Sequence, residues 1–201
     1  MKKAAALILL VFLAMPAFAQ WDDDDIPFDP EWDIFITEVY ARGDQTFMIA
    51  LGLTFPTLFM NQGNRLPNNL NLGGTGTLTY MFFLDSRISV GGTLGLMFNS
   101  TIGENMVFMI PLGIRTSYQL LFGRFEFPLH VTLGVNWHRY LDFTYFGYFM
   151  QFGTGAFFRF GPDWSFGVDT SWGWHPQWTG SRRTTVHGNF VNLLFAARFH
   201  F

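Results

Sequence analysis

Hydrophobic and polar side chains alternate with a period of two along most of the chain from residue 46 to the C-terminus. A period of two is that of a β-strand, because side chains of an α-helix return to the same face only after about 3.6 residues. Turn signals such as "DSR" and "GPD" separate the alternating segments. The pattern predicts eight strands, at residues 46–55, 75–84, 88–98, 108–119, 125–137, 147–160, 164–174 and 190–201.

The connections between these predicted strands differ in length. Short turns follow the second, fourth and sixth strands, longer segments follow the first, fifth and seventh, and the segment after the third is intermediate. The segment after the fifth strand, residues 138–146, is expected to be one of the longer loops. Short turns at one end and longer loops at the other are typical of a transmembrane β-barrel, with the turns in the periplasm. An even number of strands then places both termini in the periplasm.

Two prolines interrupt the predicted strands. Pro111 and Pro128 lie inside the fourth and fifth strands, and proline cannot donate a hydrogen bond to a neighbouring strand. A closed barrel has no free edge to accommodate this loss, so we expect bulges or positions without hydrogen bonds there.

Composition indicates what the apolar face contacts. The chain of 201 residues is 49% hydrophobic and 19% aromatic but only 13% charged, against about 25% charged in ordinary globular domains. A soluble eight-stranded barrel needs a charged exterior, whereas here the non-apolar face is mostly glycine, serine and threonine. Eight strands also enclose too little space for so many large apolar side chains. The sequence therefore predicts an all-β protein: an eight-stranded antiparallel transmembrane β-barrel over residues 44–201, with its apolar face in lipid.

The N-terminal segment has a different character. Lys2 and Lys3 precede an apolar run and the motif Ala17-Phe18-Ala19, which together predict a secretory signal peptide at residues 1–19. Residues 20–43 form an acidic segment that we expect in the periplasm, and its acid run is read as a solvated tail or, alternatively, a calcium or partner site. Residues 32–42 look strand-like and are interpreted as a periplasmic strap, an extension of the first strand or a partial plug. The chain has no cysteine, so it has neither disulfides nor a cysteine-linked lipid anchor.

The C-terminus carries the most specific motif. The final strand alternates and ends on an aromatic residue, and this arrangement resembles the small eight-stranded outer-membrane proteins, the group that includes OmpX, OmpW and the OmpA barrel domain. The resemblance covers residues 44–201 and implies location in the outer membrane of a diderm bacterium, contact with its lipid, and recognition of the last strand by the barrel-insertion machinery. The residues that match this insertion signal are Val191, Leu193, Phe195, Phe199 and Phe201.

Polar and charged residues fall on the face that a barrel would enclose. They are interpreted either as a packed polar core that closes the barrel or as the lining of a gated pore or polar ligand site. Unpaired charges in a narrow lumen would be costly, so we expect a network of charge-assisted hydrogen bonds. The residues are Arg115, Arg124, Glu126, His130, Gln151, Arg159, Asp169, Arg198 and His200.

Catalytic and metal-binding signals are weak. A Ser/His/Asp set or a histidine metal site drawn from the predicted loops is not specific, because loops are generally rich in such residues. We therefore expect no catalytic residues, metal or cofactor, and no nucleic-acid partner. The expected function is that of a monomeric, non-enzymatic protein that presents loops to an external ligand or host molecule; the alternatives are a narrow conduit or binding barrel for small or hydrophobic solutes, and a lipid-modifying enzyme. The loop residues considered are His138, Asp142, His175, Ser181 and His187.

Overall fold

The computed structural model describes residues 40–178 and 185–201. Every described residue belongs to the second of the two units of the chain, residues 36–201. The predicted signal peptide and nearly all of the acidic segment at residues 20–43 thus lie outside the described residues. Within the described part of the chain, no helix is long and apolar enough to cross a membrane.

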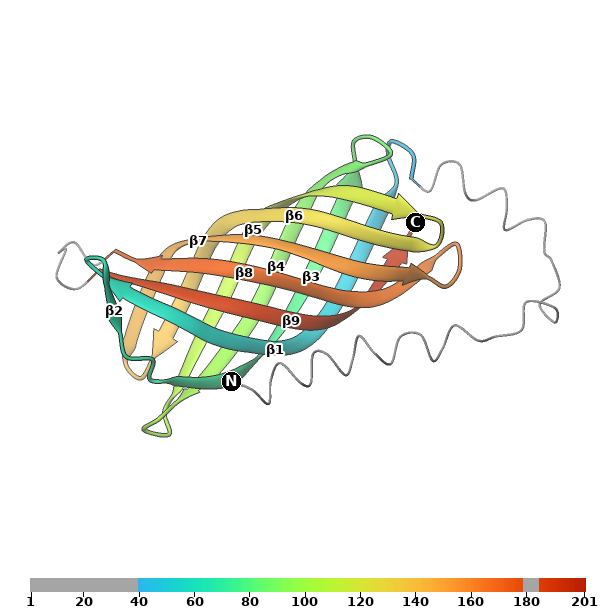
Figure 1. Ribbon diagram of the computed structural model, residues 1–201. Coiled ribbons are helices and arrows are strands. Elements are labelled where there is room, and N and C mark those ends of the chain that lie inside the picture. The colour runs from blue at the N-terminus through green and yellow to red at the C-terminus, as the bar shows by residue number, and fades with distance from the viewer. Residues whose placement is uncertain (1–39, 179–184) are drawn as a thin grey trace. The chain divides into compact units, whose positions relative to one another are not determined.

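The second unit is a closed antiparallel barrel (Figure 1). Eight long strands pair in the order in which they occur in the chain, and the last strand, β9, pairs with the first, β1. This confirms the predicted fold class and the eight predicted strands. A ninth, short strand, β2, pairs only with the end of β1. The strands are β1 (Gln45–Asn61), β2 (Asn64–Leu66), β3 (Leu70–Phe83), β4 (Ile88–Thr101), β5 (Met106–Phe122), β6 (Phe125–Tyr140), β7 (Phe143–Arg159), β8 (Trp164–Gln177) and β9 (Val186–His200).

The barrel has two distinguishable ends. We call the end with the turns at residues 84–87, 123–124 and 160–163 the turn end; the first residue of β1 and the last of β9 also lie there, on the right in Figure 1. The opposite end is called the loop end. It carries the connections at residues 62–69, 102–105, 141–142 and 178–185.

The loop predicted at residues 138–146 is wrong. β6 continues to Tyr140 and β7 begins at Phe143, so the connection is a turn of the two residues 141–142. The alternation of inward and outward side chains carries on through this stretch, with His138 opposite Tyr145. β7 has 17 residues and extends roughly 56 Å at about 3.3 Å per residue. A tilted strand needs only about 9–11 residues to span a bilayer. The strands therefore have enough length to project past the membrane.

Both prolines lie at gaps in the pairing, as expected. The β4–β5 pairing stops between Leu94–Leu112 and Met97–Met109, which leaves Pro111 without a partner on β4. Pro128 likewise has no partner on β7. The register of the pairing is the same before and after each gap, so neither proline creates a bulge. The bulge in the β1–β9 pair lies between Pro56 and Leu58.

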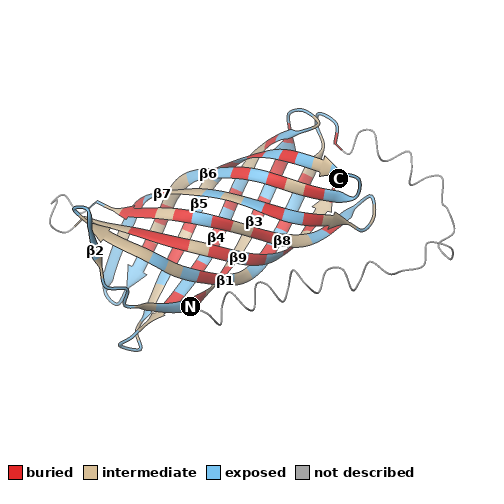
Figure 2. Cartoon of the chain, viewed as in Figure 1, coloured by how far each residue is buried: buried red, intermediate tan, exposed pale blue. Residues whose placement is uncertain are grey.

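Buried and exposed residues alternate along the long strands, as the colours in Figure 2 show. Large apolar residues face outward, and Leu51 and Phe195 are 67% and 74% exposed. Inward positions hold polar groups, glycines and a few large apolar residues such as Phe157 and Phe190. A Cβ atom at Gly134 would lie 2.1 Å from the carbonyl oxygen of Leu112, so this position has no space for a side chain.

Candidate functional site

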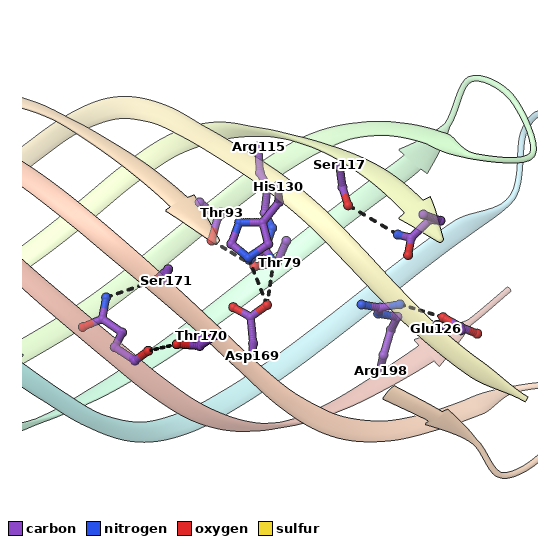
Figure 3. A network of polar contacts seen from close by, with 12 residues as sticks. Thr79, Thr93, Arg115, Ser117, Glu126, His130, Asp169, Thr170, Ser171 and Arg198 are labelled. Atoms are coloured by element: carbon purple, nitrogen blue, oxygen red, sulfur yellow. Dashed lines mark hydrogen bonds and ion pairs between the residues drawn. The ribbon is translucent and has the colours of Figure 1, made fainter. Parts of the chain in front are cut away.

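An ion pair crosses the middle of the lumen (Figure 3). Nη2 of Arg115 in β5 donates to Oδ1 of Asp169 in β8 at 2.9 Å, and Nε2 of His130 in β6 lies 3.1 Å from the same oxygen. All three residues are buried. Neither β5 nor β6 is a neighbour of β8 in the sheet, so these contacts connect strands that are not adjacent in the barrel wall.

A second charged cluster lies toward the turn end. Arg198 of β9 donates to Oε2 of Glu126 in β6 at 2.9 Å, and Arg159 of β7 lies 3.7 Å from the other carboxylate oxygen. The Arg198 guanidinium also lies over the ring of Phe157, 3.9 Å from its centroid. An arginine both pairs with a carboxylate and stacks on an aromatic ring more readily than a lysine does. This cluster again joins strands that are not adjacent.

Tyr40, which precedes β1, completes this cluster from outside the sheet. Its ring stacks on Phe83 with centroids 3.9 Å apart, and its hydroxyl donates to Oε2 of Glu126 at 2.7 Å. The hydroxyl also lies 3.2 Å from Nδ1 of His200. Burial, followed by the nearby Glu126 carboxylate, raises the pKa of the Tyr40 phenol, so it remains protonated and donates. Tyr40 therefore fills the turn end of the lumen.

This placement bears on the segment at residues 32–42. Residues 42–43 form a turn rather than a strand, and Tyr40 inserts into the lumen as a partial plug would. Residues 32–39 lie outside the described residues. Sequence reasoning did not single out Tyr40, because the alternation that marks lumen residues begins only at β1.

The structure brings eight of the nine predicted lumen residues into the barrel. Arg115, His130 and Asp169 form the central cluster, while Glu126, Arg159, Arg198 and His200 belong to the turn-end cluster, in which His200 also contacts the Ser165 hydroxyl at 2.9 Å. Gln151 is half-buried beside the central cluster. Arg124 instead lies exposed in the turn at residues 123–124. It would face the lumen only if it belonged to β6, and β6 begins at Phe125.

Little space remains around the central cluster. The cavity beside Arg115, His130 and Asp169 measures about 20 Å³. A cavity of that size holds about one water molecule. Met48, Phe157 and Leu194 pack together in the lumen nearby and fill more of it. The side chains thus leave little free space in the middle of the lumen.

The loop end contains a much larger space, which we call the loop-end cavity. Its volume is about 470 Å³, and most of its wall is apolar. His138 of β6 and His175 of β8 line it, and both are buried. Phe59, Val107, Phe143 and Phe190 are among its apolar lining residues.

Comparisons with known proteins agree with this architecture. A protein-family model matches residues 24–199, which is most of the chain. Neisserial surface protein A superimposes with a TM-score of 0.60 at 11% identity, over 79% of this chain and 97% of that one. Ail, the attachment invasion locus protein of Yersinia pestis, gives a TM-score of 0.50 at 12% identity, over 80% of this chain and 99% of that one.

The chain belongs to the matched family, and it is an eight-stranded outer-membrane β-barrel protein. At such low identity the structural matches show the fold alone. A protein of Treponema pallidum (strain Nichols), described as uncharacterized, is 29% identical over 94 residues. That alignment covers 46% of this chain and 43% of the relative, so the chain matches less than half of the relative's length.

Of the loop residues considered for catalysis, His138 and His175 lie together inside this outer-membrane barrel, with ring centroids 6.2 Å apart, whereas Asp142 and His187 are placed elsewhere. His138 is buried in β6, Asp142 is exposed in the turn at residues 141–142, and Ser181 lies outside the described residues. His175 stacks on Phe149 inside the barrel, whereas His187 stacks on Trp174, a residue of the opposite side-chain parity in β8. Among the described residues, no group of three or more histidine, aspartate or glutamate side chains is placed to hold a metal ion.

His138 was assigned to a loop because the predicted fifth strand ended at residue 137. Its position in fact continues the inward series of His130, Thr132, Gly134 and Asn136 in β6. Extending the period-two pattern by one more residue would have placed it in the lumen. Its partner across the cavity, His175, similarly continues the inward series of β8 beyond residue 174.

The residues of the predicted insertion signal lie on the outer face of β9. Leu193, Phe195 and Phe201 are exposed, and Val191 and Phe199 are half-buried. β9 is the closing strand, because it pairs with both β8 and β1.

Proposed function

We propose that this outer-membrane barrel is a non-enzymatic surface protein whose lumen is sealed and whose loop end faces the cell exterior. The observation that carries the proposal is the filling of the lumen: two charged clusters cross it, and the space beside the central one is about 20 Å³. A conducting pore would need a continuous water-filled path instead.

The energetics of the clusters support a sealed lumen. Opening a path would separate Arg115 from Asp169 and Arg198 from Glu126, and both pairs are buried. Breaking a buried ion pair leaves charges without partners, which is strongly unfavourable. Tyr40 adds a further obstruction at the turn end.

Single-channel recording in planar bilayers tests the sealed lumen. Barrel that is folded, as judged by its shifted mobility on unheated gels, should give no stable conductance steps, and its vesicles should not swell in solutes of low molecular mass. A variant that removes both clusters, with Arg115→Ala, Asp169→Ala, Glu126→Ala and Arg198→Ala, serves as the control and should conduct at least transiently. Regular conductance steps from the wild-type barrel would establish the conduit alternative.

The proposed orientation places both termini of the barrel in the periplasm. It is supported by the even number of long strands and by the position of the termini beside the turns at residues 84–87, 123–124 and 160–163. The connections are less unequal than the sequence predicted, since the turn at residues 141–142 is at the loop end.

Cysteine labelling tests the orientation without a background signal, because the chain has no native cysteine. Asp142→Cys at the loop end should react with a membrane-impermeant maleimide on intact cells, and Asp163→Cys at the turn end should react only after the outer membrane is permeabilised. Both residues are exposed in turns, so they form a matched pair. The reverse labelling pattern would refute the orientation.

The insertion signal is proposed to be the outer face of β9, with Phe201 as its terminal residue. Its position on the closing strand supports this role, since β9 must pair with β1 before the barrel has no free edge. Deletion of Phe201 should slow assembly in cells while leaving refolding in detergent unchanged.

Lipid analysis after overexpression tests the non-enzymatic role. Unchanged membrane lipids would agree with that role, and a modified lipid would contradict it.

A second function, the binding of small apolar solutes without their passage, is favoured by the loop-end cavity. Its 470 Å³ fall within the range of about 300–1,000 Å³ that is usual for ligand sites. The filled centre of the barrel lies between it and the turn end, so a bound molecule would leave by the way it entered.

A further inference from the structure

The loop-end cavity has a polar floor inside an apolar wall. Phe59, Val107 and Phe143 contribute apolar side chains from three different strands, and His138 and His175 contribute imidazoles. The described lining residues include no aspartate, glutamate, lysine or arginine. The described part of the wall therefore has no counter-ion for a charged ligand.

His138 is buried without any hydrogen bond. It is 4% exposed, and neither Nδ1 nor Nε2 has a partner among the described residues. A neutral imidazole has one N–H donor and one acceptor lone pair, and buried polar groups in native proteins nearly always have partners. A phenylalanine would fill the same space without this penalty, so packing alone does not account for a histidine here.

His175 is held rigidly, with one nitrogen left without a partner. Its ring stacks on Phe149 with centroids 5.6 Å apart and makes an edge contact with Phe190 at 5.3 Å. Nδ2 of Asn136 donates to its Nδ1 at 2.7 Å, which places the ring proton on Nε2. Nε2 has no partner among the described residues. It is thus an unused donor.

The two imidazole rings are neighbours in the cavity wall, so one ligand group that reached their buried nitrogens could contact both. Their ring centroids are 6.2 Å apart, with the planes at 86°. A hydroxyl group matches them, because it can accept from the N–H of one ring and donate to the lone pair of the other. A carboxylate only accepts, and in the described lining it would find no positive charge.

We propose that the loop-end cavity binds an uncharged, largely apolar molecule that bears a hydroxyl group, with the hydroxyl bonded to His138 and His175 and the apolar body against the phenylalanine wall. This proposal rests on the second function above, solute binding, and adds the chemical class of the ligand. It gives the two histidines a role that neither the sealed lumen nor the lipid-facing surface requires.

Three probes of the same shape test the class of ligand: 2-naphthol, naphthalene and 2-naphthoate. Binding is measured by titration of the full-length barrel in lipid nanodiscs, with empty nanodiscs to subtract partition into lipid. The wild-type protein should bind 2-naphthol roughly tenfold more tightly than naphthalene, the factor that one net hydrogen bond provides. 2-Naphthoate should bind more weakly than 2-naphthol.

The matched variants are His138→Phe and His187→Phe. His187 lies near the same end of the barrel but stacks on Trp174, and it is not part of the cavity lining. His138→Phe should reduce the preference for 2-naphthol over naphthalene to about one, and His187→Phe should leave the preference unchanged. If His138→Phe fails to fold, ¹⁵N spectra of the wild-type histidine rings provide the second measurement: 2-naphthol should shift the His138 ring nitrogens and leave those of His130 in place.

The outcomes separate the two proposals. Equal affinity for naphthalene and 2-naphthol would overturn the assignment of a hydroxylated ligand and leave solute binding intact. Tightest binding of 2-naphthoate would also overturn it, since it would indicate an anionic ligand. Absence of saturable binding for all three probes would overturn both the ligand class and solute binding.

Discussion

The Arg115–Asp169 pair offers the most direct test of how the lumen is stabilised. The two groups are 2.9 Å apart, with side chains 8% and 5% exposed. At an effective dielectric constant near 20 their attraction is about 6 kcal/mol, and much of it is offset by the loss of hydration of both ions. The net value of the pair is therefore small, although the loss of one partner is severe.

Three variants separate these two quantities. Asp169→Asn keeps the size of the side chain and a partner for His130 but leaves Arg115 without a counter-ion, so the free energy of unfolding should fall by about 3–5 kcal/mol. Arg115→Met should cost about 3 kcal/mol for the converse reason. The double variant leaves no ion unpaired and should lie within about 1–2 kcal/mol of the wild type.

The assay is urea unfolding of the barrel folded in phospholipid vesicles, followed by tryptophan fluorescence. Asp163→Asn, in the exposed turn at residues 160–163, is the control and should change the free energy of unfolding by less than about 0.5 kcal/mol. If the double variant loses the sum of the two single losses, Arg115 and Asp169 act independently. The ionic account of the lumen would then be refuted.

Other predictions concern the plug, the lipid face and the strand contacts, and each is measured by the same unfolding assay. Tyr40→Ala should lower the free energy of unfolding by about 3 kcal/mol and Tyr40→Phe by about 1 kcal/mol, because only the first loses the stacked ring; equal losses would contradict a role for the ring. Leu51→Arg, on the outer face midway along β1, should cost about 2–4 kcal/mol, against about 0–1 kcal/mol for Leu84→Arg beside the turn end. Gly134→Ala should be clearly destabilising, since its Cβ would lie 2.1 Å from a backbone oxygen, whereas Gly92→Ala has nothing within 4 Å and should be tolerated.

The fold could be predicted because the membrane imposes a strict rule on each strand. Outward side chains must be apolar, so the period of two persists from β1 to β9 and is visible without any tertiary information. The same parity located Arg115, Asp169 and Glu126 inside the barrel. The parity does not predict which of these side chains pair. The alternation gives the face of each strand, whereas the ion pairs join strands that are not adjacent in the sheet.

The remaining features depend on contacts that no periodic pattern contains. Tyr40 enters the lumen from a segment without alternation, and its partner Phe83 is an apolar residue at an inward position. The loop predicted at residues 138–146 is wrong because mixed aromatic and polar residues are typical of loops, although here His138 and Tyr145 continue the pairing of β6 with β7. The tight turn is made by Leu141 and Asp142, without the glycine or proline that often marks a turn in a sequence. Leu141 has a φ of 52°.

The two halves of the lumen differ in the partners of their ionisable side chains, and this difference separates stability from function. At the centre and the turn end, the carboxylates of Glu126 and Asp169 each contact arginine, and the contacts link strands across the barrel. At the loop end, His138 and one nitrogen of His175 are buried without partners in an apolar surrounding. A network of paired charges rigidifies a core. A buried polar group without a hydrogen bond lowers the stability of the fold, and such groups are expected mainly at functional sites. His138→Phe should therefore leave the free energy of unfolding unchanged or raise it, while Asp169→Asn lowers it. A loss of stability from His138→Phe as large as that from Asp169→Asn would show that His138 belongs to the structural core and that the loop-end cavity is not a binding site of the proposed kind.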